Sequence, residues 1–179
     1  MIKRIKHFIK FRVLGKLYNT PKLSKPINNF SHPRVILYDK LIEQTSNLGG
    51  SIVECGVGAG VSLNCICQSE ISISKLKENN PREVFAFDSF EGFPEPSIHD
   101  KSSRNLTKGQ ALERNWFLKT KSLYDELKLL GIDENKIKLH LVKGFFETTL
   151  INEKLDKKLL SGISFLHLDV DIYNSYKIC

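Results

Sequence analysis

The chain has 179 residues, of which 41% are hydrophobic, so it is long enough for one domain with a sizeable core. It contains no run of 18 apolar residues, which argues against a membrane-spanning helix. Its four cysteines form neither a CxxC pair nor a disulfide framework, and no secretory signal precedes them. We therefore expect a protein of the reducing cytoplasm without a zinc site.

The formal net charge of +7 is concentrated at the N-terminus. Residues 1–20 carry six basic side chains and no acidic one, which leaves 21 basic against 20 acidic residues in the rest of the chain. A nucleic-acid-binding domain usually spreads its basic residues over a folded face. The nearly neutral body therefore argues against a nucleic-acid partner.

Residues 1–18 place apolar side chains at helical spacing among the basic ones. Such a helix could make peripheral contact with an anionic membrane surface. It could also pack on the folded domain or on a second copy of the chain in a homo-oligomer, and its narrow apolar face favours packing. Three prolines between residues 19 and 33 indicate a linker. We expect a basic helix and linker over residues 1–30 and the folded domain over residues 31–179.

The folded domain begins with the pattern helix, strand, glycine turn and helix. A helix is expected from about residue 33 to 48, and a short apolar strand over residues 51–55. Three glycines then come at every second position, at Gly56, Gly58 and Gly60. The helix that follows should turn apolar side chains inward, namely Leu63, Ile66 and Cys67.

Three more strands are expected. The strand over residues 84–87 ends in Asp88, and the polar residues 97–115 form a long loop that could close over a site. After a helix over residues 117–130, the third strand, 137–142, alternates apolar and polar residues like an edge strand. The fourth, 163–168, is mostly apolar and reads as buried. Strands that alternate with helices predict a doubly wound, Rossmann-like α/β fold with a parallel sheet.

Unusual residues follow the end of every predicted strand. The glycines follow the first strand and Asp88 the second, and the remaining two strands are followed by Gly144-Phe145 and by Asp169 with Asp171. Ligands bind beyond the carboxyl ends of the strands in parallel sheets. These residues therefore predict one common site.

The residue types suggest the chemistry of that site. Glycines let a ligand reach the backbone N–H groups at a helix start, which favours a nucleotide-like ligand over a plain tight turn. Asp88 could accept the hydroxyls of a ribose or cap the turn over residues 89–92. Asp169 and Asp171 are oxygen ligands suited to Mg²⁺ or Ca²⁺, or acceptors within the turn that contains them. We interpret His167 as a hydrogen-bonded buried histidine.

Four segments together resemble the macrocin O-methyltransferase family. They are ECGVGAG (residues 54–60), DSFEGFPEP (88–96), KGFFETTL (143–150) and HLDVDIY (167–173). The resemblance runs from about residue 35 to the end of the chain. It implies a class I S-adenosylmethionine-dependent enzyme that methylates a hydroxyl of a sugar or glycosylated small molecule.

The resemblance also implies roles for single residues. The methionine portion of the cofactor would lie against Glu54, Gly56, Gly58 and Gly60. Asp88 would hold the ribose, and Gly144 with Phe145 would border the adenine. Asp169 would be the catalytic, metal-binding aspartate that positions the acceptor hydroxyl beside Mg²⁺. Asp171 receives no role, and no residue is identified as the general base.

The sequence departs from the family pattern at its end. Family members continue after the fourth strand and supply an Asp-Asp pair that completes the metal site, whereas this sequence ends at Cys179. We therefore expect a fragment whose fourth strand, which would be central in the complete sheet, presents an unpaired apolar edge. Its Mg²⁺ site would be incomplete. An inactive cofactor- or partner-binding remnant is the main alternative to an active methyltransferase.

Two other enzyme classes fit the sequence less well. A nicotinamide-dependent oxidoreductase would carry GxGxxG and an acidic residue about 20 positions further on, whereas this chain has GxGxG and Asp88 lies 32 residues after Gly56. A nucleic-acid methyltransferase would carry a motif such as Asn-Pro-Pro-Tyr, which this chain lacks. The body of the chain is also nearly neutral, which argues against a nucleic-acid substrate.

Overall fold

A computed structural model of the chain describes residues 33–58, 60–101, 103–110, 136–150, 159 and 161–179. Within them the elements follow in the order α2 (Pro33–Thr45), β1 (Ser51–Cys55), α3 (Val61–Lys77), β2 (Val84–Asp88), η1 (Ile98–Asp100), β3 (Leu139–Lys143), α5 (Phe146–Thr149), β4 (Ile163–Leu168) and α7 (Tyr173–Ile178). No helix of this part of the chain is long and apolar enough to cross a membrane. The expected N-terminal helix and linker and the expected helix over residues 117–130 lie outside the described residues.

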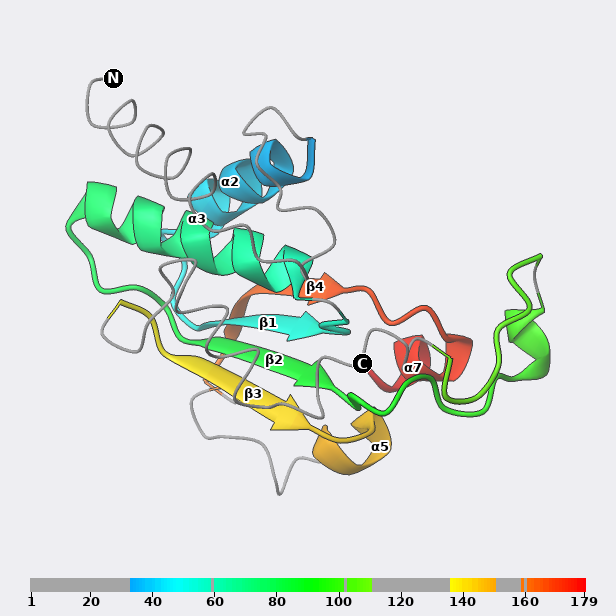
Figure 1. The fold of residues 1–179 in the computed structure, drawn as a ribbon. Helices are drawn as coiled ribbons and strands as arrows, with labels where there is room; N and C mark the ends of the chain where they lie inside the picture. Colours follow the sequence, from blue (N-terminus) through cyan, green and yellow to red (C-terminus); the bar gives the residue numbers. More distant parts are fainter. Residues whose placement is uncertain (1–32, 59, 102, 111–135, 151–158, 160) are drawn as a thin grey trace.

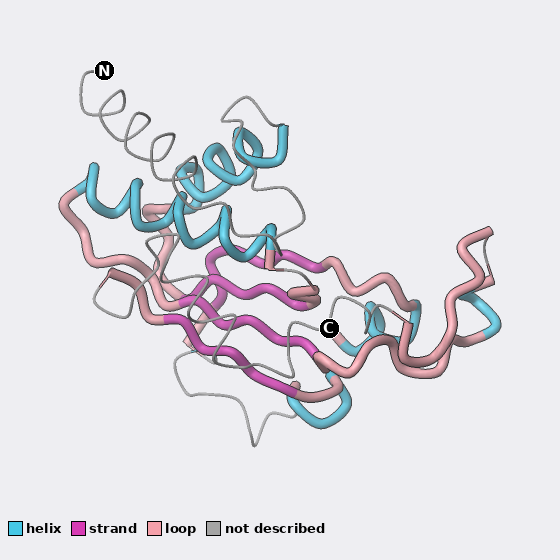
Figure 2. The backbone as a smooth tube through the Cα atoms, viewed as in Figure 1, coloured by secondary structure: helices cyan, strands magenta, loops and turns pink. Residues whose placement is uncertain are grey.

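The four strands form one parallel sheet in the order β3-β2-β1-β4 (Figure 1). Their carboxyl ends therefore meet at one edge of the sheet, where the arrowheads lie in Figure 1. Figure 2 shows the four strands side by side. All five residues of β1 are buried, as expected for a central strand covered on both faces. The predicted Rossmann-like α/β fold is confirmed.

Each face of the sheet has its own apolar core. Helices α2 and α3 cover one face and pack on side chains such as Ile52 and Val84. The other face buries Val53, Phe85 and Phe87 against Val170. This division follows from the strand period of two, which sends successive side chains to opposite faces.

Helix α3 is stabilised mainly by this packing. Its sequence contains many serine and β-branched residues, which are only moderate helix formers. The predicted inward side chains Leu63, Ile66 and Cys67 have no exposed surface. The helix is thereby fixed directly above β1, and its first turn lies beside the end of that strand.

The two outer strands differ from one another. Strand β3 pairs only with β2 among the described residues, which confirms the predicted edge strand. Strand β4 forms the opposite edge, where Ile163 and Leu166 are 49% and 45% exposed. The unpaired apolar edge is thus confirmed, but the interpretation of this strand as buried is wrong for these side chains. Apolar composition predicts burial only where a neighbour covers the strand.

Arg82 links four elements at the amino-terminal side of the sheet. Its guanidinium bonds both carboxylate oxygens of Glu70 on α3, with Nη2 2.7 Å from Oε2. Its Nη1 donates to the carbonyl of Thr45 on α2, at 2.9 Å, and to the hydroxyl of Ser164 on β4, at 3.0 Å. The two charged side chains are only 9% and 4% exposed. This buried cluster holds both helices and β4 in register with the entry of β2.

Candidate active site

The glycine loop lies at the carboxyl end of β1 and is closed on one side and open on the other. Gly56, Gly58 and Gly60 have φ values of +89°, +49° and +72°. A Cβ on Gly56 would lie 2.1 Å from the carbonyl oxygen of Asp169. A Cβ on Gly58 would meet no atom within 4 Å among the described residues. A ligand could therefore approach the backbone at Gly58, whereas Gly56 is required by the fold.

The start of α3 opens onto the same loop. Its N-cap is Gly60, in the left-handed conformation, and no side chain caps the helix there. The first N–H groups of a helix have no intrahelical partner and give this end a partial positive charge. The 17-residue helix therefore offers a polar group of a ligand both charge and hydrogen-bond donors.

Asp88, the last residue of β2, binds the glycine loop directly. Its Oδ2 accepts hydrogen bonds from the N–H groups of Val57, at 2.8 Å, and Gly58, at 2.9 Å. Its Oδ1 accepts from the N–H of Phe90, at 2.7 Å, so Asp88 also caps the turn that follows it. A carboxylate offers about four acceptor positions. Three of these positions are used by the N–H groups of Val57, Gly58 and Phe90.

Glu54 lies beneath the loop and not on its open side. Its side chain has no exposed surface, and its Oε1 accepts from the hydroxyl of Ser62, at 2.5 Å, and bonds Nδ1 of His167, at 3.0 Å. Its Oε2 has no partner among the described residues. Burial raises the pKa of Glu54, while the hydrogen bonds from His167 and Ser62 lower it.

His167 connects Glu54 to helix α2. Its Nε2 lies 3.0 Å from the hydroxyl of Tyr38. The hydrogen bond to Glu54 raises the pKa of His167. Burial, followed by the nearby Glu54, raises the pKa of Tyr38 to about 12, so its hydroxyl keeps its proton at neutral pH. The expectation of a hydrogen-bonded histidine agrees with these contacts. Tyr38 was not singled out from the sequence.

The residues after β3 join the site through Asp88. The N–H of Gly144 donates to the carbonyl of Asp88 at 3.0 Å, and Gly144 has a φ of +142°. Phe145 follows and precedes α5, where its carbonyl accepts hydrogen bonds from Thr148 and Thr149. Gly144 is therefore bonded to the residue that binds the glycine loop, and Phe145 follows it directly.

The segment after β4 lies behind the glycine loop. The N–H of Asp169 donates to the carbonyl of Cys55 at 3.0 Å, and its own carbonyl faces Gly56. Its side chain is exposed. Asp171 has a φ of +58° and accepts from Arg104 at 2.5 Å. In the described ranges no three acidic, histidine or cysteine side chains could together hold a metal ion. Asp169 and Asp171 by themselves therefore do not fit Mg²⁺ as a complete site.

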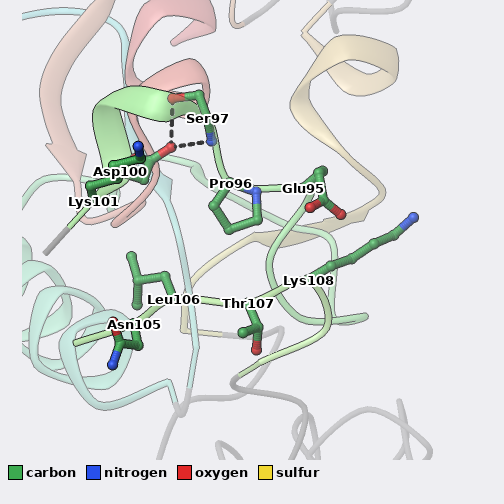
Figure 3. Close-up of a pocket in the computed structure, with 9 residues that line it drawn as sticks. All are labelled: Glu95, Pro96, Ser97, Asp100, Lys101, Asn105, Leu106, Thr107 and Lys108. Atoms are coloured by element: carbon green, nitrogen blue, oxygen red, sulfur yellow. Dashed lines mark hydrogen bonds between the residues drawn. The ribbon is translucent and has the colours of Figure 1, made fainter. Parts of the chain in front are cut away.

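A long arm, residues 89–110, follows β2 and reaches the start of α7. Asp100 accepts from the N–H of Tyr173 at 2.7 Å, and the rings of His99 and Tyr173 lie 4.5 Å apart. This hydrogen bond is the main cause of the lowered pKa of Asp100. Within the arm is an open groove of about 510 Å³, shown in Figure 3, where the Asp100 carboxylate bonds Ser97. The groove is lined by Glu95, Pro96, Ser97, Asp100, Lys101, Asn105, Leu106, Thr107 and Lys108, none of them from the glycine loop.

Comparisons with known proteins place this geometry in a family. The sequence profile of the macrocin-O-methyltransferase (TylF) family matches residues 35–178. The crystal structure of CalS11, a calicheamicin methyltransferase, is similar with a TM-score of 0.63 and 20% identity, covering 97% of this chain and 70% of that chain. The O-methyltransferase NovP is similar with a TM-score of 0.61 and 20% identity, covering 98% of this chain and 76% of that chain.

No curated protein sequence matches the chain. At 20% identity the two solved structures show a common fold, whereas the family profile spans most of the sequence and includes all four of the segments noted above. By that match, this chain belongs to the macrocin O-methyltransferase family.

Proposed function

We propose that the chain binds S-adenosylmethionine at the glycine loop and transfers its methyl group to a hydroxyl of a sugar or glycosylated small molecule. The observation that carries this proposal is the bonding of Asp88 to Val57 and Gly58, beside a loop that is open at Gly58. Membership of an O-methyltransferase family supports the reaction type. The sugar acceptor is supported by the family and by the calicheamicin methyltransferase of similar fold.

Each residue of the loop region would have a separate task in cofactor binding. The remaining acceptor position of Asp88 would take a ribose hydroxyl, and the start of α3 would take a polar group of the methionine portion. Glu54 would act from beneath, by holding Ser62 in the first turn of α3. Gly144 and Phe145 would lie along the adenine.

The chemistry then requires little of the protein beyond alignment. S-adenosylmethionine supplies a methyl group on a sulfonium, which is already a good leaving group. The protein has to hold the acceptor hydroxyl in line with that methyl group, exclude water and accept the hydroxyl proton. Asp169 borders the glycine loop through its backbone and carries an exposed carboxylate, which makes it our candidate for holding the acceptor.

A cofactor-binding remnant without turnover is the second candidate. The two candidates share the cofactor site and differ only in methyl transfer.

Calorimetric titration of the purified chain with S-adenosylhomocysteine tests the cofactor site, with circular dichroism to establish that the protein is folded. We expect saturable binding in the micromolar range. A folded protein that does not bind would overturn the proposal. Incubation with S-adenosylmethionine and a panel of glycosides, with Mg²⁺ or with EDTA, then separates the two candidates. Methylated product identifies an enzyme, and binding without product identifies the remnant.

Alanine substitutions at two glycines should separate a loss of binding from a loss of stability. Gly58→Ala places a methyl group in open space at a φ that costs an L-residue about 1–2 kcal/mol, so the protein should fold. The methyl group would block the approach of the cofactor, and affinity for S-adenosylhomocysteine should fall at least about tenfold. Gly56→Ala forces Cβ onto the Asp169 carbonyl and should cost about 3 kcal/mol of stability.

Urea unfolding and calorimetry on the same two variants measure both effects. Equal losses of stability in the two variants would contradict the assignment of one glycine to the fold and the other to the ligand.

A further inference from the structure

Four side chains form a continuous hydrogen-bonded chain beneath the glycine loop. The hydroxyl of Tyr38 lies 3.0 Å from Nε2 of His167, and Nδ1 of His167 lies 3.0 Å from Oε1 of Glu54. The hydroxyl of Ser62 donates to the same Oε1 at 2.5 Å. The rings of Tyr38 and His167 are also in edge contact, with centroids 5.4 Å apart and planes at 89°. The contacts connect α2, β4, β1 and α3 in that order.

The hydrogen atoms of this chain can be assigned without conflict. Tyr38 donates its O–H to Nε2 of a neutral His167, whose Nδ1–H donates to Glu54, and Ser62 donates from the other side. Every donor then has an acceptor, and the carboxylate receives two hydrogen bonds. Hydrogen bonds that share one acceptor in a buried setting depend on one another's geometry.

The two ends of the glycine loop are held by this chain. Glu54 is two residues before Gly56, and Ser62 is two residues after Gly60, so their mutual hydrogen bond closes the loop from beneath. His167 fixes the position of the Glu54 carboxylate from the neighbouring strand, where the two residues are paired in register. Tyr38 fixes the orientation of the imidazole from α2.

We infer that His167 and Tyr38 are positioning residues for the glycine loop, and that Tyr38 on α2 controls ligand affinity at a loop whose ends are held by Glu54 and Ser62. The inference rests on the proposed function because its main readout is cofactor binding. A merely structural role for Tyr38 would lower the stability of the whole domain and leave the affinity of the folded fraction unchanged.

A double-mutant cycle between Tyr38→Phe and Ser62→Ala tests this inference. The two substitutions lie at opposite ends of the chain of hydrogen bonds and each removes one hydroxyl. We expect each to weaken S-adenosylhomocysteine binding about fivefold, because only part of the energy of the lost hydrogen bond is transmitted to the loop. The double variant should lose about tenfold, less than the about 25-fold of independent effects. Independent, multiplicative losses would overturn the inference, as would unchanged affinities.

Two further sets of variants separate positioning from general destabilisation. His167→Asn keeps an N–H donor near the place of Nδ1 but not the acceptor of the Tyr38 hydroxyl, so it should lose about fivefold, as Tyr38→Phe does, whereas His167→Leu should lose about 25-fold. Tyr176→Phe removes a hydroxyl from a 46%-exposed tyrosine on α7 and should leave affinity unchanged. An asparagine variant as weak as the leucine variant would argue against positioning by the donor.

Amide hydrogen exchange decides the inference even if the parent chain does not bind S-adenosylhomocysteine, a result that would refute the proposed function alone. In Tyr38→Phe the amides of Val57 and Gly58 should exchange at least about fivefold faster, because the loop is less firmly held. In Tyr176→Phe their exchange should not change. Equal exchange in both variants would overturn the positioning role.

Discussion

Replacing Asp88 with alanine should lower the affinity for S-adenosylhomocysteine by about 100-fold or more. The substitution removes the acceptor of the Val57 and Gly58 N–H groups and the position proposed for a ribose hydroxyl. A hydrogen bond to a charged group contributes about 1.5–3 kcal/mol, so the lost bond to the ribose accounts for about 10- to 100-fold, and the loss of the loop geometry that Asp88 holds adds to it. Isothermal calorimetry on folded protein measures the effect.

Two variants serve as controls for the loss of Asp88. Asp88→Asn keeps the shape but offers one oxygen where the loop and the turn use two, so we expect it to bind more tightly than the alanine variant and less tightly than the parent. Glu91→Gln removes the charge of an exposed carboxylate that pairs with Lys143, and affinity should not change. An Asp88→Ala variant with parental affinity would place the cofactor elsewhere.

Replacing Arg82 with alanine should reduce the free energy of unfolding by about 3–5 kcal/mol. The substitution leaves the buried Glu70 carboxylate without its charged partner and removes donors from Thr45 and Ser164. The comparison is Arg104→Ala, in which the ion pair with Asp171 is 57% and 36% exposed. That exposed pair should contribute little to stability, because solvent and salt screen it.

Urea unfolding followed by circular dichroism compares the two arginine variants. Arg82→Lys should lie between them, because one ammonium cannot reproduce the planar fork that reaches Glu70, Thr45 and Ser164 together. Similar losses in the Arg82 and Arg104 alanine variants would show that the buried cluster is not what fixes the helices to the sheet.

The features predicted well from the sequence depend on local pattern. The first strand, the glycine loop and the inward face of α3 come from neighbouring residues whose spacing is visible directly. Asp88 was identified by its place at the end of a strand, and the structure places it on the loop. Helix α2 ends at Thr45, a few residues before the expected end at about residue 48, because Gly49 and Gly50, which follow it, mark the end of the connection and not the last helical residue.

The features that the sequence could not provide depend on register between distant segments. Glu54 and His167 are 113 positions apart and meet only because β1 and β4 pair in one register. The same holds for Arg82 and Ser164, which are 82 positions apart. Alternation along β4 places His167 on one face but does not say which neighbour it faces. The prediction that β4 is buried failed for the same reason, because the composition of a strand does not show which neighbours cover it.

The attachment of the arm to the segment that follows β4 should weaken as the ionic strength rises. Strand β1 lies between β2 and β4 in the sheet. The arm follows β2, and it contacts the segment that follows β4. One polar contact between the arm and this segment is the exposed pair of Arg104 and Asp171, whose attraction dissolved salt screens. Another is the bond from the Tyr173 amide to Asp100. Raising the salt concentration should therefore weaken the contact of Arg104 with Asp171. The Tyr173 amide, which bonds Asp100, is the group at which this loosening of the arm can be observed.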